Sequence, residues 1–316
     1  MSDIIRETAA RCRNWGKWGE TDERGTLNYI TPGAIIRAAR LIRRGALFSL
    51  AIPFDSKGPQ PHGHPRRFNP IHRMMLTGAD YASGALSLPG GVGFSDDMII
   101  MPTHCATQWD ALSHCFLDGK MYNGFDATEI SSQGARKNSI DKMARGIVGR
   151  GVLIDMARHR GKDWLEKGET FDHTDLEAAA SAQGITIEPH DILCVRTGFM
   201  KYWYELNDKE SFYDGFNEPG LTYSRELVEW FQQREVPNLV TDTIANEVTY
   251  EPESGVALPL HCALMRNLGV TLTEIAWLDD LADACAEDGR WSFLYVAAPL
   301  KVVAGTGAPV NPIAIR

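Results

Sequence analysis

Cysteine is scarce in this chain, and its distribution excludes two kinds of structure. The six cysteines are scattered over 316 residues, and no two of them show the C-x-x-C spacing of a zinc knuckle. They are also too few and too far apart for a disulfide framework in a protein of this size. Three of them, Cys105, Cys115 and Cys262, directly follow a histidine. Because neighbours on a strand face opposite ways, small buried packing residues are expected rather than Cys/His nucleophiles.

Long hydrophobic runs and an excess of basic residues are also missing. No apolar stretch approaches the roughly 18 residues of a membrane span, and the first residues lack the apolar core of a signal peptide. The 41 acidic residues outnumber the 32 basic ones and give a net charge of -9, which disfavours nucleic acid and anionic membranes as partners. We therefore expect a cytoplasmic protein that acts on a small molecule.

Three common catalytic motifs do not occur. A G-x-S-x-G elbow is absent, which disfavours a serine hydrolase. Neither G-x-G-x-x-G nor a P-loop is present, which removes the usual dinucleotide and nucleoside-triphosphate sites.

The densest group of chemically useful side chains lies in residues 101–123. His104, Gln108, Asp110 and His114 fall within eleven residues, all at even positions. A straight strand would hold them too far apart to share a metal ion. A continuous helix would point the pair 104/108 and the pair 110/114 to nearly opposite sides. The spacing therefore predicts a strand end, a tight turn and a helix capped by Asp110 or a neighbour, with the side chains converging at the turn.

The remaining chain alternates strands with a few helices and long loops, which favours a mixed α/β single domain. Residues 1–31 form an aromatic N-terminal arm, expected to pack on the body, on a neighbouring subunit or at the mouth of a pocket, and residues 32–316 form the domain itself. Helices are expected at 32–44, 174–183, 224–234 and 260–268, and strands at 47–54, 97–101, 151–155, 192–196, 238–243, 271–278 and 293–297.

The loop-rich stretch 55–96 is long enough to shape a binding site. It holds histidines and arginines that are suited to an acidic or carbonyl substrate, with a solvated basic loop as the alternative: His62, His64, Arg66, Arg67, His72 and Arg73.

The cluster carries a family resemblance. His104-x-x-Thr107-x-x-Asp110-x-x-x-His114 resembles the pattern H-x-G-T-H-x-D-x-x-x-H of the cyclase family of metal-dependent hydrolases, which includes bacterial kynurenine formamidase and isatin hydrolase. Residues 240–243, His261 and Glu274 follow in the family's order, and both ends of the chain look like its longer members.

The resemblance implies the swivelling β/β/α fold, one or two Mn or Zn ions, and a homodimer or homotetramer. It makes His114 the general base. The metal ligands are then His104, Gln108 and Asp110, with His261 and Glu274 as later ligands or close neighbours. Substrate contacts are expected from Trp15, Trp18, Trp109 and Arg73, the tryptophans and other aromatic loops framing an apolar pocket.

Two departures from the family pattern affect the expected function. Ala106 replaces a glycine, and Gln108 replaces a histidine. A neutral amide oxygen is a harder and weaker ligand than imidazole, so the site is expected to prefer Mn, to hold one ion instead of two, or to lack catalysis. The leading hypothesis is a metal-dependent hydrolase of an amide, formamide, lactam or lactone bond in a small aromatic or cyclic substrate. The alternatives are a metal-dependent lyase or cyclase on a carbonyl substrate and a non-catalytic binding relative.

Overall fold

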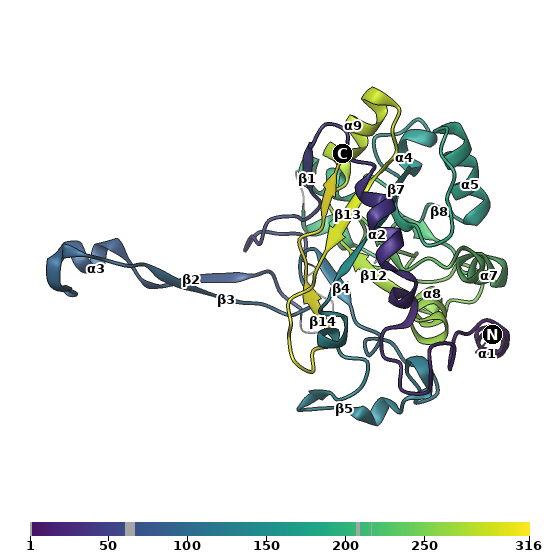
Figure 1. Cartoon of the computed structure of the whole chain (residues 1–316), viewed down its shortest axis with the longest axis horizontal. Helices are drawn as coiled ribbons and strands as arrows, with labels where there is room; N and C mark the ends of the chain where they lie inside the picture. Colours follow the sequence, from purple (N-terminus) through teal and green to yellow (C-terminus); the bar gives the residue numbers. More distant parts are fainter. Residues whose placement is uncertain (1, 61–66, 207–208, 216) are drawn as a thin grey trace.

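A computed structural model describes residues 2–60, 67–206, 209–215 and 217–316, with a mixed α/β body from which one long hairpin protrudes (Figure 1). The α/β class expected from the sequence is confirmed. The body is built on one nine-stranded sheet. Its order is β1 (Leu47–Ser49), β15 (Ile313–Ile315), β13 (Ser292–Ala297), β7 (Ile147–Asp155), β9 (Ile192–Arg196), β11 (Asn238–Thr241), β12 (Thr271–Glu274), β4 (Gln108–Asp110) and β14 (Gly307–Pro309).

The middle of the sheet is parallel and buried. Strands β7, β9, β11 and β12 run in the same direction, and every residue of β9, β11 and β12 is buried. Helix α2 packs on β7 and β13, and α5 packs on β7. The helices are α1 (Ser2–Arg11), α2 (Pro32–Ala39), α3 (Gly78–Ala82), α4 (Met156–His159), α5 (His173–Ala182), α6 (Phe199–Glu205), α7 (Arg225–Arg234), α8 (Pro259–His261), which continues as a π-helix (Cys262–Leu268), and α9 (Asp279–Asp288). In the described part of the chain, no helix is long and apolar enough to span a bilayer.

The sheet curls until its two edges meet. Strand β14 is one edge, while β15 pairs with β1 at the other edge, yet only residues 310–312 connect β14 to β15. Since so short a link spans only about 10–13 Å, the edges must lie close together. The Ser49 hydroxyl donates to Asn311 Oδ1 at 2.8 Å across this seam.

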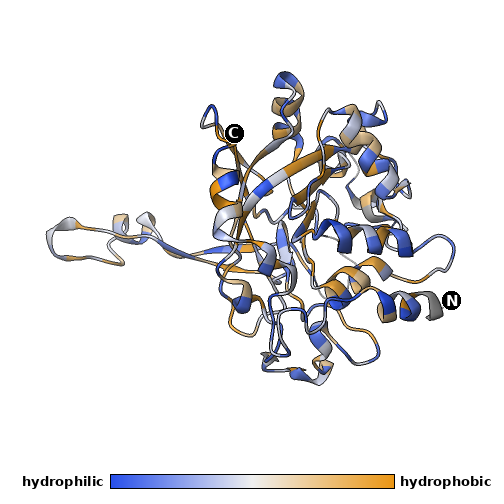
Figure 2. Ribbon diagram, turned by 45° about the vertical axis from the view of Figure 1, so that its right-hand side comes forward, coloured by the Kyte–Doolittle hydropathy of each residue, from blue (hydrophilic) through white to orange (hydrophobic). Residues whose placement is uncertain are grey.

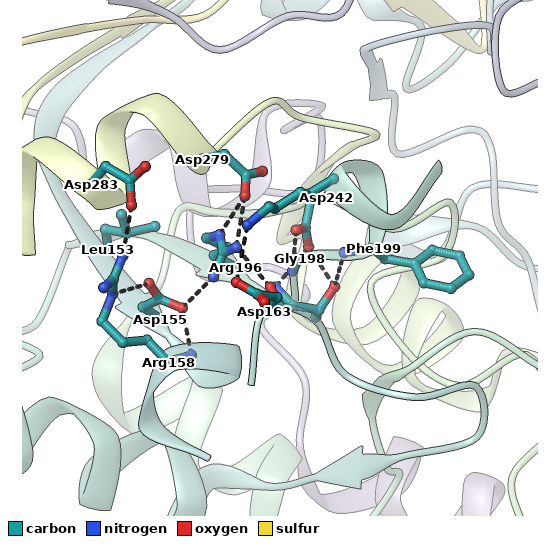
Figure 3. Close-up of polar contacts among 12 residues, drawn as sticks. Leu153, Asp155, Arg158, Asp163, Arg196, Gly198, Phe199, Asp242, Asp279 and Asp283 are labelled. Carbon is teal, nitrogen blue, oxygen red and sulfur yellow. Dashed lines mark hydrogen bonds and ion pairs between the residues drawn. The ribbon is translucent and has the colours of Figure 1, made fainter. Parts of the chain in front are cut away.

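A buried ion network holds the carboxyl ends of the parallel strands (Figure 3). Arg196, at the end of β9, donates to Asp155 at 2.8 Å and to Asp279 at 2.7 and 2.9 Å. Asp242, just after β11, accepts from the backbone N–H groups of Thr197 (2.9 Å) and Gly198 (2.7 Å), and Gly198 starts α6 with a φ of 78°. Arg196 pairs with Asp155 and Asp279, while the hydrogen bonds of Asp242 fix the residues at which α6 begins.

The N-terminal segment packs on its own body. Helix α1 contacts α7 and the π-helix, and the Asn14 amide N–H donates to the Asn267 carbonyl at 2.9 Å. Thr26 donates through its hydroxyl to the carbonyls of Pro237 and Gly269.

Several expected elements differ from the structure. The helix expected at 32–44 ends at Ala39, and the strand expected at 47–54 ends at Ser49. The stretch expected to be loops contains β2 (Ile71–Leu76) and α3, and β2 pairs with β3 (Asp96–Ile100) in the protruding hairpin. Shorter two-stranded pairs join β5 (Ile130–Ser131) to β6 (Gly134–Ala135) and β8 (Thr170–Phe171) to β10 (Gly220–Leu221).

Candidate metal centre

Strand β4 carries the centre of the cluster. It lies between β12 and β14, and its pairing places Gln108 opposite Glu274 and Asp110 opposite Gly307. Because side chains alternate along a strand, Gln108 and Asp110 share one face. The helix expected after Asp110 is wrong: the chain makes a turn in which the His114 N–H donates to the Ala111 carbonyl at 2.8 Å.

His104, which precedes β4, and His114, which follows it, lie next to each other beside Asp110. One potential ligand atom from each of the three residues lies within 4.8 Å of the others. His104 Nε2 is 3.3 Å from Asp110 Oδ1, and the two imidazole rings stack with centroids 4.1 Å apart. Thr103 Oγ1 lies 3.3 Å from His104 Nδ1, which leaves Nε2 directed at the carboxylate.

Asp110 also belongs to a second group, formed with His261 and Glu274, whose ligand atoms likewise lie within 4.8 Å of one another. Glu274 ends β12 and His261 ends α8, so two distant parts of the chain converge on β4. His261 Nε2 lies 3.1 Å from Glu274 Oε1. All three side chains are buried. The structure thus brings together the histidines, acids and glutamine expected from the sequence.

The Gln108 amide is held in one orientation. Its Nε2 donates to Glu274 Oε2 at 2.6 Å, so its Oε1 must point elsewhere. Among the described residues, none donates a hydrogen bond to Gln108 Oε1 or to either carboxylate oxygen of Asp110, although all three atoms are buried. Buried acceptors without donors are costly unless a cation satisfies them. This donor set fits a divalent metal ion.

Burial and neighbouring charges change the acid–base behaviour of the cluster. Burial, assisted by the Glu274 carboxylate, raises the pKa of Asp110 to about 6. Burial alone would lower the pKa of His261, but hydrogen bonds to Glu247 and Glu274 raise it to about 10. The surroundings therefore destabilise the Asp110 carboxylate, and a bound cation would offset this effect.

Glu247 is a site residue that the sequence reasoning missed. Its Oε1 accepts from His261 Nδ1 at 2.8 Å and from the His261 backbone at 2.6 Å, and its Oε2 accepts from the Leu260 backbone at 2.7 Å. A carboxylate behind a histidine fixes the orientation of the ring. Its only sequence signal is an acid in the polar loop after β11, which is too common a pattern to single it out.

Glu218 was missed in the same way. It is 1 % exposed, its Oε2 accepts from the Ile244 N–H at 2.6 Å, and burial followed by the charge of Glu274 raises its pKa to about 8.

Two backbone positions in left-handed conformations shape the cluster. Ala106, with a φ of 57°, makes the bend before β4, and Ile275, with a φ of 54°, ends β12 directly after Glu274. The Thr107 hydroxyl donates to the Ile275 carbonyl at 2.6 Å and joins the two bends. This conformation disfavours residues with a Cβ, which explains physically why the family pattern has glycine at 106.

Replacing Ala106 by glycine is therefore expected to stabilise the protein. Relief of the left-handed strain should raise the free energy of unfolding by about 1 kcal/mol, less the entropy that glycine adds to the unfolded chain. Urea denaturation of the metal-free protein measures the change. Ala85→Gly, in the exposed hairpin, is the control and should not raise the free energy of unfolding. If both substitutions change the free energy of unfolding equally, or if both lower it, the backbone at Ala106 is not strained.

Gly307 leaves room for the His104 imidazole. A Cβ built at this position would overlap the His104 imidazole, so only glycine on β14 lets the ring reach Asp110. The GTG sequence in the C-terminal tail carries no sign of this role, because β14 is distant from His104 in sequence.

The structure does not bring the proposed substrate-contact residues to the cluster within one chain. Trp109 is fully buried in the main core, on the face of β4 opposite Gln108 and Asp110, so its side chain does not face the cluster. Trp15 donates to the Arg266 carbonyl at 2.7 Å, five residues beyond His261 in the π-helix. Trp18 packs on Tyr29, which stacks on His190, two residues before β9 begins. Glu274 lies where β12 ends. Because β9 and β12 run in the same direction, Trp18 and Glu274 lie near opposite ends of the parallel strands.

Arg73 lies on β2 of the protruding hairpin and donates to the His72 carbonyl at 2.8 Å. His62, His64 and Arg66 lie outside the described residues.

The fold and the cluster together define an α/β protein with a buried group of residues that could hold a metal ion and a half-buried histidine beside it. A family model described as putative cyclase matches residues 48–248. This chain belongs to the cyclase family, as its resemblance in sequence predicted.

Solved structures agree with this family. One described as a novel cyclase is 42% identical, covers 97% of this chain and 100% of its own, and superposes with a TM-score of 0.88. Isatin hydrolase A from Labrenzia aggregata, solved with benzyl benzoate, is 20% identical, with 92% and 98% covered and a TM-score of 0.62. A potential metal-dependent hydrolase with cyclase activity is 15% identical, with 85% and 98% covered and a TM-score of 0.50. The last two show likeness of fold alone, and no functionally curated protein matches the sequence. The family model and the structure that is 42% identical support an enzyme of the cyclase family.

Proposed function

We propose that this protein is a divalent-metal-dependent hydrolase that opens an amide, formamide, lactam or lactone bond in a small aromatic or cyclic substrate. The observation that carries the proposal is the convergence of His104, Gln108 and Asp110, with buried acceptor atoms that no described residue satisfies, beside the half-buried His114.

His104 Nε2, Asp110 and Gln108 Oε1 would hold the ion, with Glu274 and His261 as further ligands or close neighbours. Imidazole, carboxylate and amide oxygen suit Mn or Zn. When bound, such an ion lowers the pKa of water and polarises a substrate carbonyl. Because Asp110 belongs to both groups of ligands, the site can accommodate one ion or two neighbouring ions.

His114 is the proposed general base. It is the more exposed of the two stacked imidazoles, so substrate and water can reach it. In the proposed reaction, His114 accepts the proton of the attacking water and then delivers it to the nitrogen or oxygen that leaves the carbonyl carbon.

His261 and Glu247 act on the other side of the cluster. Held between two glutamates, His261 keeps Glu274 in place, and Glu274 in turn accepts from the Gln108 amide. This chain of hydrogen bonds keeps the Gln108 oxygen directed away from Glu274 and available as a ligand.

An apolar core cluster packs beside the site. Ala106 and Ile275, which flank the ligands in sequence, pack in one cluster with aromatic and aliphatic residues of α6 and the neighbouring loops. These residues are Phe199, Met200, Trp203, Phe212, Ile244 and Ala245. Because these side chains are buried, the cluster supports the two bends beside the ligands at Ala106 and Ile275.

Metal analysis combined with turnover tests the proposal. We expect the purified protein to contain near-stoichiometric Mn or Zn by elemental analysis, and to hydrolyse members of a panel of lactams, lactones and formanilides. Chelation should abolish turnover and added metal should restore it. In ¹⁸O-labelled water the product should gain one labelled oxygen, whereas a lyase or cyclase would leave it unlabelled. Full activity without metal, or ligand-induced thermal stabilisation without turnover, would contradict the proposal.

A further inference from the structure

Arg67 lies next to the bend that carries the candidate metal centre. Residues 67–70 lead into β2, at the root of the hairpin that extends from the body (Figures 1 and 2). The Phe68 carbonyl accepts from the Cys105 thiol at 3.1 Å, and Cys105, which directly follows His104, is fully buried. The residue after Arg67 is therefore fixed against the residue after a proposed metal ligand.

A second contact holds the same segment. The Asn69 side-chain oxygen accepts from the Gln60 N–H at 2.9 Å, and Gln60 is 3 % exposed. Pro70, the last residue before β2, is buried as well. These contacts fix the backbone from which the Arg67 side chain starts.

The positive charge of Arg67 reaches the candidate metal centre. Burial raises the pKa of Asp110, and the Arg67 guanidinium is one of the cationic groups that act in the opposite direction. The same charge opposes the rise that burial causes in the pKa of Cys105. Because the interaction between two charges weakens with distance and is screened by solvent, a guanidinium that acts on both groups lies near them.

Arg67 carries a charge without a matching acid. It is half-buried, yet in the described part of the chain no carboxylate forms an ion pair with it. Other arginines that are shielded from solvent, Arg150, Arg160 and Arg196, each pair with at least one carboxylate. Shielding a charge from water is costly unless a partner compensates it. An anionic ligand would be such a partner.

From these observations we infer that Arg67 binds a carboxylate of the substrate, so that the enzyme acts on an anionic amide, formamide, lactam or lactone. The inference rests on the proposed function and specifies its substrate. A guanidinium presents two parallel N–H donors that match the two oxygens of a carboxylate. The buried acids Asp110 and Glu274 repel an anion, so the carboxylate is held at Arg67 and the reacting carbonyl faces the metal ligands.

Matched substrate pairs test the inference by turnover. Each formanilide, lactam and lactone is compared with the analogue that carries one additional carboxylate. Arg67→Ala should lower kcat/KM about 10²-fold for the carboxylates, mainly through KM, and at most about threefold for the neutral members, since truncating one partner of a shielded charge pair has a large effect. Arg67→Lys should recover part of the loss, because an ammonium supplies the charge without the paired donors. Arg37→Ala, an exposed arginine of α2, is the matched control and should behave like the parent.

Binding of two simple probes tests the same contact without turnover. Benzoate carries the carboxylate, and benzamide is its neutral isostere. Calorimetry on chelator-treated protein should show that benzoate binds about tenfold more tightly than benzamide, and Arg67→Ala should remove this preference. Circular dichroism and elemental analysis check that the variants are folded and keep the metal content of the parent.

The two measurements separate this inference from the proposed function. Equal losses of kcat/KM for charged and neutral substrates, or a preference for benzoate that persists in Arg67→Ala, would overturn the inference. Turnover that Arg67→Ala leaves unchanged, with no preference for benzoate, would overturn it as well but leave the hydrolase in place. An Arg67-dependent preference for benzoate in a protein without turnover would instead contradict the proposed function and support the carboxylate site.

Discussion

Asp110→Asn is expected to abolish stoichiometric metal binding and to lower kcat/KM by at least about 10³-fold, because Asp110 is the one residue shared by both groups of potential ligands. Asparagine preserves the shape of the side chain, so the loss reflects the charge. Elemental analysis and turnover of the best panel substrate measure the two effects. Asp126→Asn, an exposed acid paired with Lys120, is the control and should retain both metal and activity.

The same substitution is expected to stabilise the metal-free protein, and the effect depends on pH. The pKa of Asp110 is raised in the folded state from 3.8 to about 6, so folding disfavours the carboxylate. That penalty is absent below pH 3.8, grows between 3.8 and 6, and is complete above 6. A rise of this size corresponds to roughly 3 kcal/mol.

Urea denaturation at two pH values measures this penalty. Asp110→Asn should unfold with a free energy about 3 kcal/mol above that of the metal-free parent at pH 8, and with nearly the same free energy near pH 4. A destabilised variant at pH 8 would mean that the structural value of the carboxylate exceeds its desolvation cost. The combined result would show that this buried charge is retained for metal binding at the expense of stability.

His114→Ala is expected to lower kcat by about 10²–10⁴-fold while the metal content stays unchanged, because His114 is proposed to move protons. The geometry alone permits another role, since a ligand atom of His114 lies within 4.8 Å of those of His104 and Asp110. Metal content therefore decides between base and ligand. If the ion is lost together with activity, His114 is a ligand.

Two further measurements sharpen this test. Added imidazole should restore part of the turnover of His114→Ala, and the variant should lose the ionisation of a base from its pH–rate profile. His159→Ala, at the exposed end of α4, is the matched control and should behave like the parent. Absence of rescue together with an unchanged pH profile would contradict the assignment of His114 as the base.

The sequence by itself determined those features that depend on neighbouring residues. The helix expected at 224–234 agrees with α7, where the Ser224 hydroxyl accepts from the Leu227 N–H. The apolar run 192–196 forms β9 with the same bounds, because strands buried on both faces are continuously apolar. The spacing of His104, Gln108, Asp110 and His114 also identified the family and the need for a bend.

Only the tertiary structure decided which distant residues meet the cluster and which nearby ones do not. Pairing of β4 with β12 brings Glu274 to Gln108, while strand alternation turns Trp109 into the core although it lies between two proposed ligands. Glu247 gains its role from His261, fourteen residues later, and Gly307 gains its role from His104, which is distant in sequence. The sequence did not predict the hairpin of β2 and β3, which lies in a stretch expected to be loops. Neither face of these two strands is buried in the chain, so they lack the alternating pattern that burial imposes.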